Sequence, residues 1–202
     1  MIPNSDWRVA LTDNYLPHRI DQWLVQWVNS RPEANFITLW DETIDPTWLP
    51  YFAEAGGATP QQIILAACGV ARLCLPLIPA GEDRPRIAIE TAEAWCRGEA
   101  IQEEQLSKVK TDTPLAASLY YSHTASLRSS YYAAYTAHYV VCAVCTPSQC
   151  CTYIYCAISD ALRAGIESQM ICATFRKYLP FERTPKPKGL TLWQRLAVED
   201  TK

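Results

Sequence analysis

One long stretch of the chain is almost without charge, because Arg128 is the only charged side chain between Thr113 and Ser159. Within it we predict a helix that starts near Thr113 or Pro114 and runs for about thirty residues. Its apolar, aromatic and histidine positions repeat at intervals of four and three: Leu119, His123, Leu127, Tyr131, Tyr135, His138 and Cys142. A long helix with so little charge is seldom exposed to water on every side. The sequence therefore predicts that this helix either lies at the centre of a bundle or takes part in an interface.

The other helical patterns are separated by prolines and glycines, which often mark helix ends. Apolar residues at helical spacing predict five more helices, over residues 16–30, 60–77, 83–98, 147–164 and 166–178. The segment 33–57 is aromatic and acidic, and Pro46 and Pro50 interrupt it, which predicts a loop with one short helix. No alternating strand pattern competes with these helices. The predicted fold class is all-α, a single-domain bundle of roughly seven to nine helices.

The C-terminal end differs in character from this bundle. We assign residues 1–183 to one helical domain and residues 184–202 to a Pro/Lys linker followed by a short C-terminal amphipathic helix. In that tail TPKPKG is extended and basic, because its prolines leave little alternative. Thr191 and Gln194 have the spacing of a capping box, which predicts that the last helix begins there.

Composition excludes several classes of protein. The chain is 49% hydrophobic and only 19% charged, so it is not intrinsically disordered. Its net charge of −3 argues against direct nucleic-acid binding. The first residues show neither the basic nor the apolar region of an export signal, and no run of eighteen uninterrupted apolar residues predicts a membrane span. We therefore expect a cytoplasmic protein.

Nine cysteines are the unusual feature of the composition. Without an export signal they are expected to be free thiols, and most fall on apolar helical stripes, where cysteine packs as a small hydrophobic residue. The alternative is a zinc or iron–sulfur site, which needs four converging ligands. The clustered cysteines would supply them: Cys142, Cys145, Cys150 and Cys156. The buried-core interpretation is favoured, and no cofactor is expected.

The sequence contains no recognisable catalytic arrangement. His123 and His138 are about 22 Å apart along one straight helix and have no nearby carboxylate in sequence to orient them. Glu90 and Glu93 share a helix face, which is the ordinary pattern of an exposed acidic surface. We therefore predict a protein that is not an enzyme.

Two groups of residues are candidates for binding a protein partner. Tyrosines concentrate in the uncharged stretch, Tyr131 and Tyr135 among them, and tyrosine is enriched at interfaces. They would either line a seam between helices or form an external binding surface. Residues 1–105 hold 15 acidic and 7 basic residues, a balance of −8. Exposed aromatic and acidic residues in that half are expected to contact a basic partner: Trp40, Asp41, Glu42, Asp45 and Trp48.

The block DRPRIAIETAEAWCRGE, residues 83–99, resembles the Imm-5-like family of immunity proteins from bacterial polymorphic-toxin systems. The resemblance extends over about residues 60–180, and its second part rests on YYSHTASLRSSYYAAYTAHYVVCAV, an Ala- and Tyr-rich helix with two histidines. It implies an all-helical protein that neutralises a toxin. The motif residues either staple helices together or contact the partner: Asp83, Arg84, Pro85, Arg86, Glu90 and Trp95.

The first functional hypothesis is a non-enzymatic binding protein that occludes the working surface of a toxin effector, for example a basic nuclease. A second hypothesis is a helical protein with a cysteine-ligated metal or iron–sulfur cluster. A third is a phage or mobile-element inhibitor of a host defence factor, which shares the occlusion mechanism. A homodimer is compatible with each of them.

Overall fold

The structure is a computed structural model that describes residues 7–13, 20–121 and 125–181. Within these ranges the chain is all-α and has no strand, which confirms the predicted fold class. The α-helices are α1 (Trp7–Asp13), α2 (Ile20–Asn29), α3 (Phe36–Glu42), α4 (Leu49–Ala55), α5 (Pro60–Cys74), α6 (Arg84–Cys96), α7 (Glu103–Ser118), α8 (Ala125–Cys145), α9 (Cys150–Ala164) and α10 (Ser168–Tyr178). Short 3₁₀ helices are η1 (Pro46–Trp48), η2 (Leu75–Leu77) and η3 (Pro147–Gln149). The predicted count of seven to nine helices is too low, since the described residues alone contain ten α-helices.

Part of the difference lies in the N-terminal third. The segment 33–57 forms α3 and α4, not a loop with one short helix, and α1 was not predicted. Asn35 caps α3 by accepting a hydrogen bond from the backbone N–H of Thr38 at 2.9 Å. Pro46 and Pro50 stand in the first turns of η1 and α4, where a helix loses no hydrogen bond to a proline. The prolines that seemed to interrupt this segment therefore begin its helices.

The helix predicted to start near Thr113 is also wrong in its bounds. The chain forms two helices here, because α7 ends at Ser118 and α8 begins at Ala125. Pro114 lies inside α7, where it removes one backbone hydrogen bond but does not start a helix. The two helices pack against one another. Helical spacing happens to continue across the break, so periodicity could not locate it. His123, residues 16–19 and the predicted tail 184–202 lie outside the described residues.

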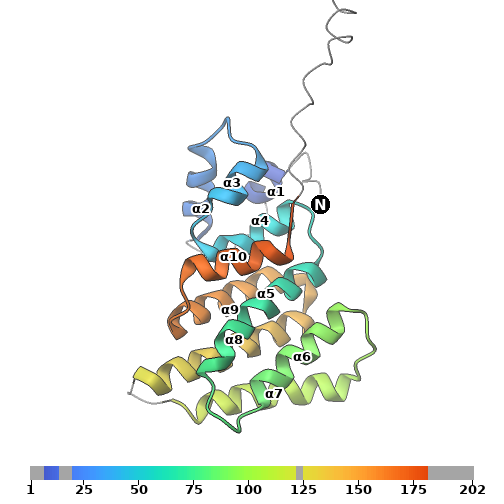
Figure 1. Ribbon diagram of the computed structural model, residues 1–202. Helices are drawn as coiled ribbons and strands as arrows, with labels where there is room; N and C mark the ends of the chain where they lie inside the picture. The colour runs from blue at the N-terminus through green and yellow to red at the C-terminus, as the bar shows by residue number, and fades with distance from the viewer. Residues whose placement is uncertain (1–6, 14–19, 122–124, 182–202) are drawn as a thin grey trace, which may run out of the picture.

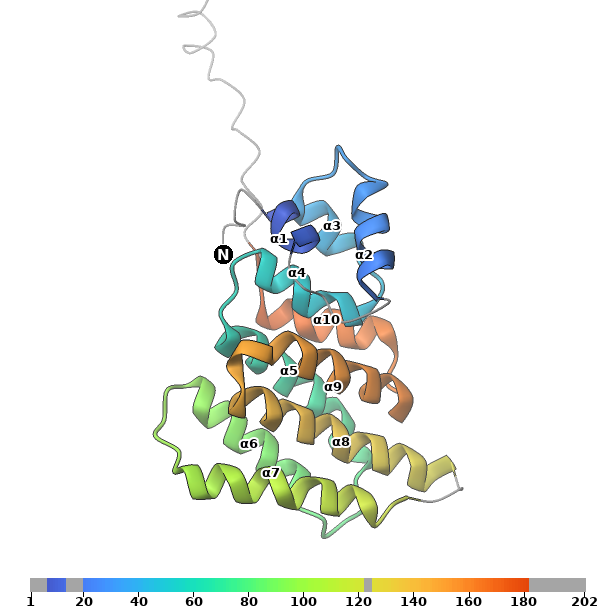
Figure 2. The same cartoon turned by 180° about the vertical axis from the view of Figure 1, so that it is seen from behind.

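The helices are arranged around α5. In both views α1–α4 gather at one end, α6 and α7 lie at the other, and α5, α9 and α10 lie between them (Figures 1 and 2). Helix α5 packs against α6, α8, α9 and α10. It begins with a complete capping box, in which Thr59 Oγ1 accepts from the N–H of Gln62 at 3.3 Å and Gln62 Oε1 accepts from that of Thr59 at 2.8 Å.

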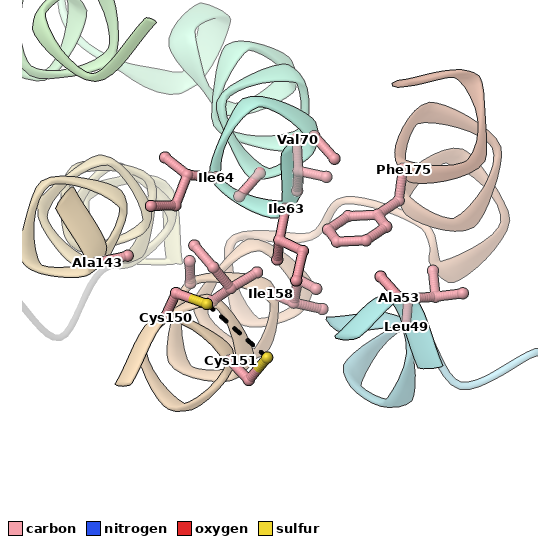
Figure 3. Close-up of a cluster of buried hydrophobic side chains, with 14 of the residues drawn as sticks. Leu49, Ala53, Ile63, Ile64, Val70, Ala143, Cys150, Cys151, Ile158 and Phe175 are labelled. Carbon is pink, nitrogen blue, oxygen red and sulfur yellow. Dashed lines mark hydrogen bonds between the residues drawn. The ribbon is translucent and has the colours of Figure 1, made fainter. Parts of the chain in front are cut away.

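The core beside α5 is built from aliphatic and aromatic side chains of four helices. Phe175 of α10 points toward Ile63 of α5, with Leu49 of α4 and Ile158 of α9 close by (Figure 3). All four are fully buried. Gly69 allows Tyr178 to approach α5, because a Cβ atom at this position would lie 2.4 Å from the tyrosine ring. This helix must therefore be both apolar and, at one position, without a side chain.

Among the described residues one segment, Pro60–Leu77, is long and apolar enough to cross a membrane by length and composition. Half of it is buried inside the protein. Four neighbouring helices surround α5, so burial within the core by itself requires an apolar sequence here.

Candidate binding site

The aromatic residues expected to form an acidic contact surface belong to the core. Trp40 is only 3% exposed, and its ring packs against that of Phe181 with a centroid distance of 5.0 Å. Trp48 is half-buried, with its ring 5.5 Å from that of Trp27. The expectation that Trp40 is exposed is wrong, because Phe181, far away in the sequence, covers it. Trp48 likewise has one face occupied.

The acidic residues of the same group do not form one surface with the tryptophans. Asp45 accepts hydrogen bonds from the backbone N–H and hydroxyl of Thr47, at 2.9 and 2.6 Å, and so caps η1. Glu42 is exposed and lies 3.8 Å from Arg31. Asp41 is exposed as well. This end of the molecule therefore offers exposed carboxylates without the aromatic anchors that were expected beside them.

The 83–99 block forms helix α6, and several of its charged side chains pair with one another or with Glu82 just before it. Pro85 is buried in the first turn of α6, and Gly98 follows the helix with a positive φ of 79°. Arg86 contacts Asp83 at 2.9 Å and Glu90 at 3.1 Å, and Arg84 pairs with Glu82.

The same block is also tied to its neighbours. Glu93 binds Arg72 of α5 through two hydrogen bonds of 2.6 Å, and Trp95 packs against the core. These contacts support the interpretation of the block as a staple between helices.

The clustered cysteines do not converge on a metal site. Cys142 and Cys145 lie on α8, whereas Cys150 and Cys156 lie on α9. The Sγ atom of Cys150 lies 3.9 Å from that of Cys151, its neighbour in sequence (Figure 3). In the described ranges no group of three or more histidine, cysteine and carboxylate side chains is placed to hold a metal ion. Cys142, Cys145 and Cys156 are near enough to affect one another, but they do not form a ligand set.

Burial keeps most thiols protonated. It raises the pKa of Cys142 to about 11 and that of Cys74 to about 12. Cys142 Sγ lies 3.4 Å from Nε2 of His138, and burial lowers the pKa of this histidine. The pair is therefore neutral on both sides at physiological pH. A neutral thiol and a neutral imidazole do not form the thiolate–imidazolium pair that activates a nucleophilic cysteine.

A cavity of about 370 Å³ lies between α8 and α9. Five tyrosines line it together with one ion pair; its lining residues are Tyr131, Tyr132, Tyr135, Tyr139, Tyr155, Cys156, Ser159, Asp160 and Arg163. We call it the tyrosine cavity. All five tyrosines are partly exposed, so the cavity opens to solvent. The structure thus brings the two predicted binding tyrosines, Tyr131 and Tyr135, into one site.

The tyrosines of α8 form a continuous series of ring contacts. Centroids of Tyr131 and Tyr135 are 4.8 Å apart, and those of Tyr135 and Tyr139 are 6.0 Å apart. The series extends beyond the cavity to Tyr121, whose ring lies 5.6 Å from that of Tyr131. The spacing of four residues places these rings on one side of the helix. They form a firm aromatic wall because each ring restricts the next.

The hydroxyls of this wall stay protonated. Burial and a hydrogen bond to Tyr135 raise the pKa of Tyr131 to about 12, and burial also raises the pKa of Tyr139. A protonated phenol can both donate and accept a hydrogen bond. The cavity therefore presents hydrogen-bond donors at every physiological pH.

The charges of the cavity come from one pair at its α9 side. Arg163 Nη1 donates to Asp160 Oδ1 at 2.9 Å. The side chain of Asp160 is 8% exposed, whereas that of Arg163 is 62% exposed and its guanidinium carbon lies 5.7 Å from the centre of the Tyr132 ring. Burial raises the pKa of Asp160, and the ion pair with Arg163 opposes this shift. The charge that meets the solvent is thus that of the guanidinium.

Sequence reasoning missed the α9 side of this site. Asp160 and Arg163 are the first oppositely charged pair after the uncharged stretch, and their spacing of three places them on one helix face. That signal was available in the sequence. The sequence did not show that α9 packs beside α8. This packing brings Tyr155 and the ion pair next to Tyr131 and Tyr135.

Comparisons of the chain with protein-family models, with curated proteins and with solved structures found no match.

Proposed function

We propose that this chain is a non-enzymatic binding protein whose contact surface is the tyrosine cavity and the tyrosines around it. The observation that carries the proposal is the wall of partly exposed tyrosine rings on α8, open to solvent and facing α9. Tyrosine supplies a large, rigid contact area at a low cost in conformational entropy, and it dominates many binding energies at interfaces. The partial exposure of all five rings favours an external binding surface over a seam between helices.

The chemistry of the site supports binding over catalysis. The most nearly catalytic pair, His138 and Cys142, is neutral, and the pKa of the Cys142 thiol is raised rather than lowered. Asp160 is held by Arg163 and does not stand opposite a second titratable carboxylate in the lining of the cavity. Such a site recognises a surface through rings, hydroxyls and one guanidinium.

The resemblance of the 83–99 block to immunity proteins suggests what the partner is. We infer that the chain binds a toxin effector in the cytoplasm and covers its working surface. This step is an analogy with the Imm-5-like family, whereas the contact surface is argued from the site. The exposed Asp41 and Glu42 provide a separate acidic edge at the other end of the molecule.

Calorimetry of the purified chain with each effector protein encoded beside its gene tests the proposal. We expect one of them to bind, and we expect Tyr135→Ala to weaken that binding by about thirtyfold, as for a tyrosine at the centre of an interface. Met170→Ala is the matched control, because Met170 is an exposed side chain of α10 that does not line the cavity. Absence of binding to every neighbouring effector, or equal affinity of the Tyr135 variant, would contradict the proposal.

A further inference from the structure

We infer that the tyrosine cavity receives an acidic side chain, an aspartate or glutamate, from the partner protein. The inference rests on the proposed function, namely that this cavity is the contact surface. It adds the chemistry of the group that enters.

The charge of Asp160 acts on the cavity lining, since it contributes to the raised pKa of Tyr131 and of Tyr139, but this carboxylate is mostly buried and already paired. Asp160 is 8% exposed, and Arg163 stands over it at 2.9 Å with most of its own side chain in solvent. A partner lysine or arginine would have to displace Arg163 from Asp160 and would gain little by the exchange. An approaching carboxylate instead meets the exposed guanidinium directly.

Arg163 retains donors for such a carboxylate. A guanidinium carries five N–H groups, and its contact with Asp160 is made through Nη1. Its remaining N–H groups can bind a second carboxylate, with the geometry that makes arginine effective in pairing with planar anions. Asp160 thus holds Arg163 in place at the edge of the cavity, which Arg163 lines.

Two further hydrogen-bond donors of the lining are available to a carboxylate held by Arg163. The protonated phenol of Tyr139 and the hydroxyl of Ser159 can donate hydrogen bonds around the cavity, whereas the phenol of Tyr131 is already hydrogen-bonded to Tyr135. Helices α8 and α9 carry two arginines, Arg128 and Arg163, and Asp160 is their only acidic residue. The lining itself carries one charge of each sign, and the exposed one, on Arg163, complements a carboxylate.

Tripeptide probes test this inference without any effector. The ring signals of Tyr131, Tyr135 and Tyr155 are followed by nuclear magnetic resonance while Ac-Gly-Glu-Gly-NH₂ is added, and then the same peptide with glutamine or lysine in place of glutamate. We expect the glutamate peptide to shift these signals saturably and to bind about tenfold more tightly than the glutamine peptide, because only the carboxylate forms charge-assisted hydrogen bonds.

Two variants assign the selectivity to Arg163. The double variant Asp160→Asn/Arg163→Gln removes the guanidinium without leaving a buried unpaired carboxylate, so it keeps the fold measurable by circular dichroism. We expect it to bind the glutamate and glutamine peptides equally. Arg128→Gln is the matched control, since it removes the same charge from α8 outside the cavity lining and should preserve the preference.

The outcomes separate this inference from the proposed function. Equal binding of the glutamate and glutamine peptides, tighter binding of the lysine peptide, no shift with any peptide, or a preference that survives the double variant would each overturn the acidic-side-chain assignment. Effector binding that depends on Tyr135 would then still stand. Conversely, selective binding of the glutamate peptide with no bound effector would retain the assignment and reject the proposed function.

Discussion

Replacement of Arg163 by glutamine should destabilise the fold through Asp160, the residue it leaves behind. The Asp160 carboxylate is 8% exposed and is paired with Arg163 at 2.9 Å. Removing one partner of a fully buried ion pair costs about 3–5 kcal/mol. Arg163 itself is 62% exposed, so water screens this pair, and we reduce the expected cost to about 1–2 kcal/mol. Asp160→Asn in the same chain should recover most of that loss, because the buried group is then neutral.

The stability cost of Arg163→Gln should depend on pH, because Asp160 titrates differently in the folded and unfolded states. Burial raises the pKa of Asp160 above its ordinary value of 3.8, so the folded state holds the proton more tightly than the unfolded state does. The stability that this group contributes is present at low pH and is lost as the pH rises through the folded pKa. Loss of Arg163 raises that pKa further, so the penalty of Arg163→Gln should be largest at neutral pH and should shrink on acidification.

Urea denaturation followed by circular dichroism, at pH 7 and at pH 4, measures both effects across the wild type, the two single variants and the double variant. A penalty for Arg163→Gln below about 0.5 kcal/mol at pH 7 would refute this reasoning, since screening would then account for the whole pair. So would a double variant that is less stable than Arg163→Gln alone.

Three further predictions concern the core, a helix cap and the thiols. Phe175→Ala should cost about 3–5 kcal/mol in urea denaturation because the ring is fully buried, whereas Met170→Ala on the same helix, 47% exposed, should cost less than about 1 kcal/mol. Thr59→Ala should lower the free energy of unfolding by about 1 kcal/mol, as it removes one half of the α5 capping box; an unchanged stability would refute the role of the cap. In the native protein at pH 8, Cys74 and Cys142 should react with a thiol-specific disulfide reagent far more slowly than in urea. Both thiols are buried, and their raised pKa values keep them protonated; equal rates would contradict this.

The elements that sequence reasoning located well are those with local signals. Pro85 and Gly98 bracket α6, and Pro60 opens α5, because proline and glycine act on the backbone within a few residues of themselves. Pro114 misled the prediction because a proline inside a helix and a proline that starts one look alike in sequence. Only the packing of α7 along α8 decides between the two.

The candidate site depended on contacts that no local pattern carries. Trp40 is covered in part by Phe181, about 140 residues away in the chain, and sequence periodicity cannot reveal such a contact. Tyr131 and Tyr135 could be selected because their composition and spacing are local. Their position opposite Asp160 and Arg163 follows from the pairing of α8 with α9, which is a property of the whole bundle.

The uncharged stretch was expected to be either the centre of the bundle or part of an interface. Helix α8 packs against α5, α6, α7 and α9, and a role of its tyrosine face in an interface stays a prediction. Its buried face carries small side chains such as Ala133, Ala137 and Val141, which let the neighbouring helices approach closely. Its other face carries the tyrosines, which reach the solvent through hydroxyls instead of charges. Hydroxyl groups form hydrogen bonds with water when the surface is free. When a partner covers the surface, they cost less free energy to desolvate than the charged groups of lysine or glutamate. A helix exposed only to water usually carries more charge on its surface, so the near absence of charge on the exposed face of α8 supports the proposal that a partner protein binds there.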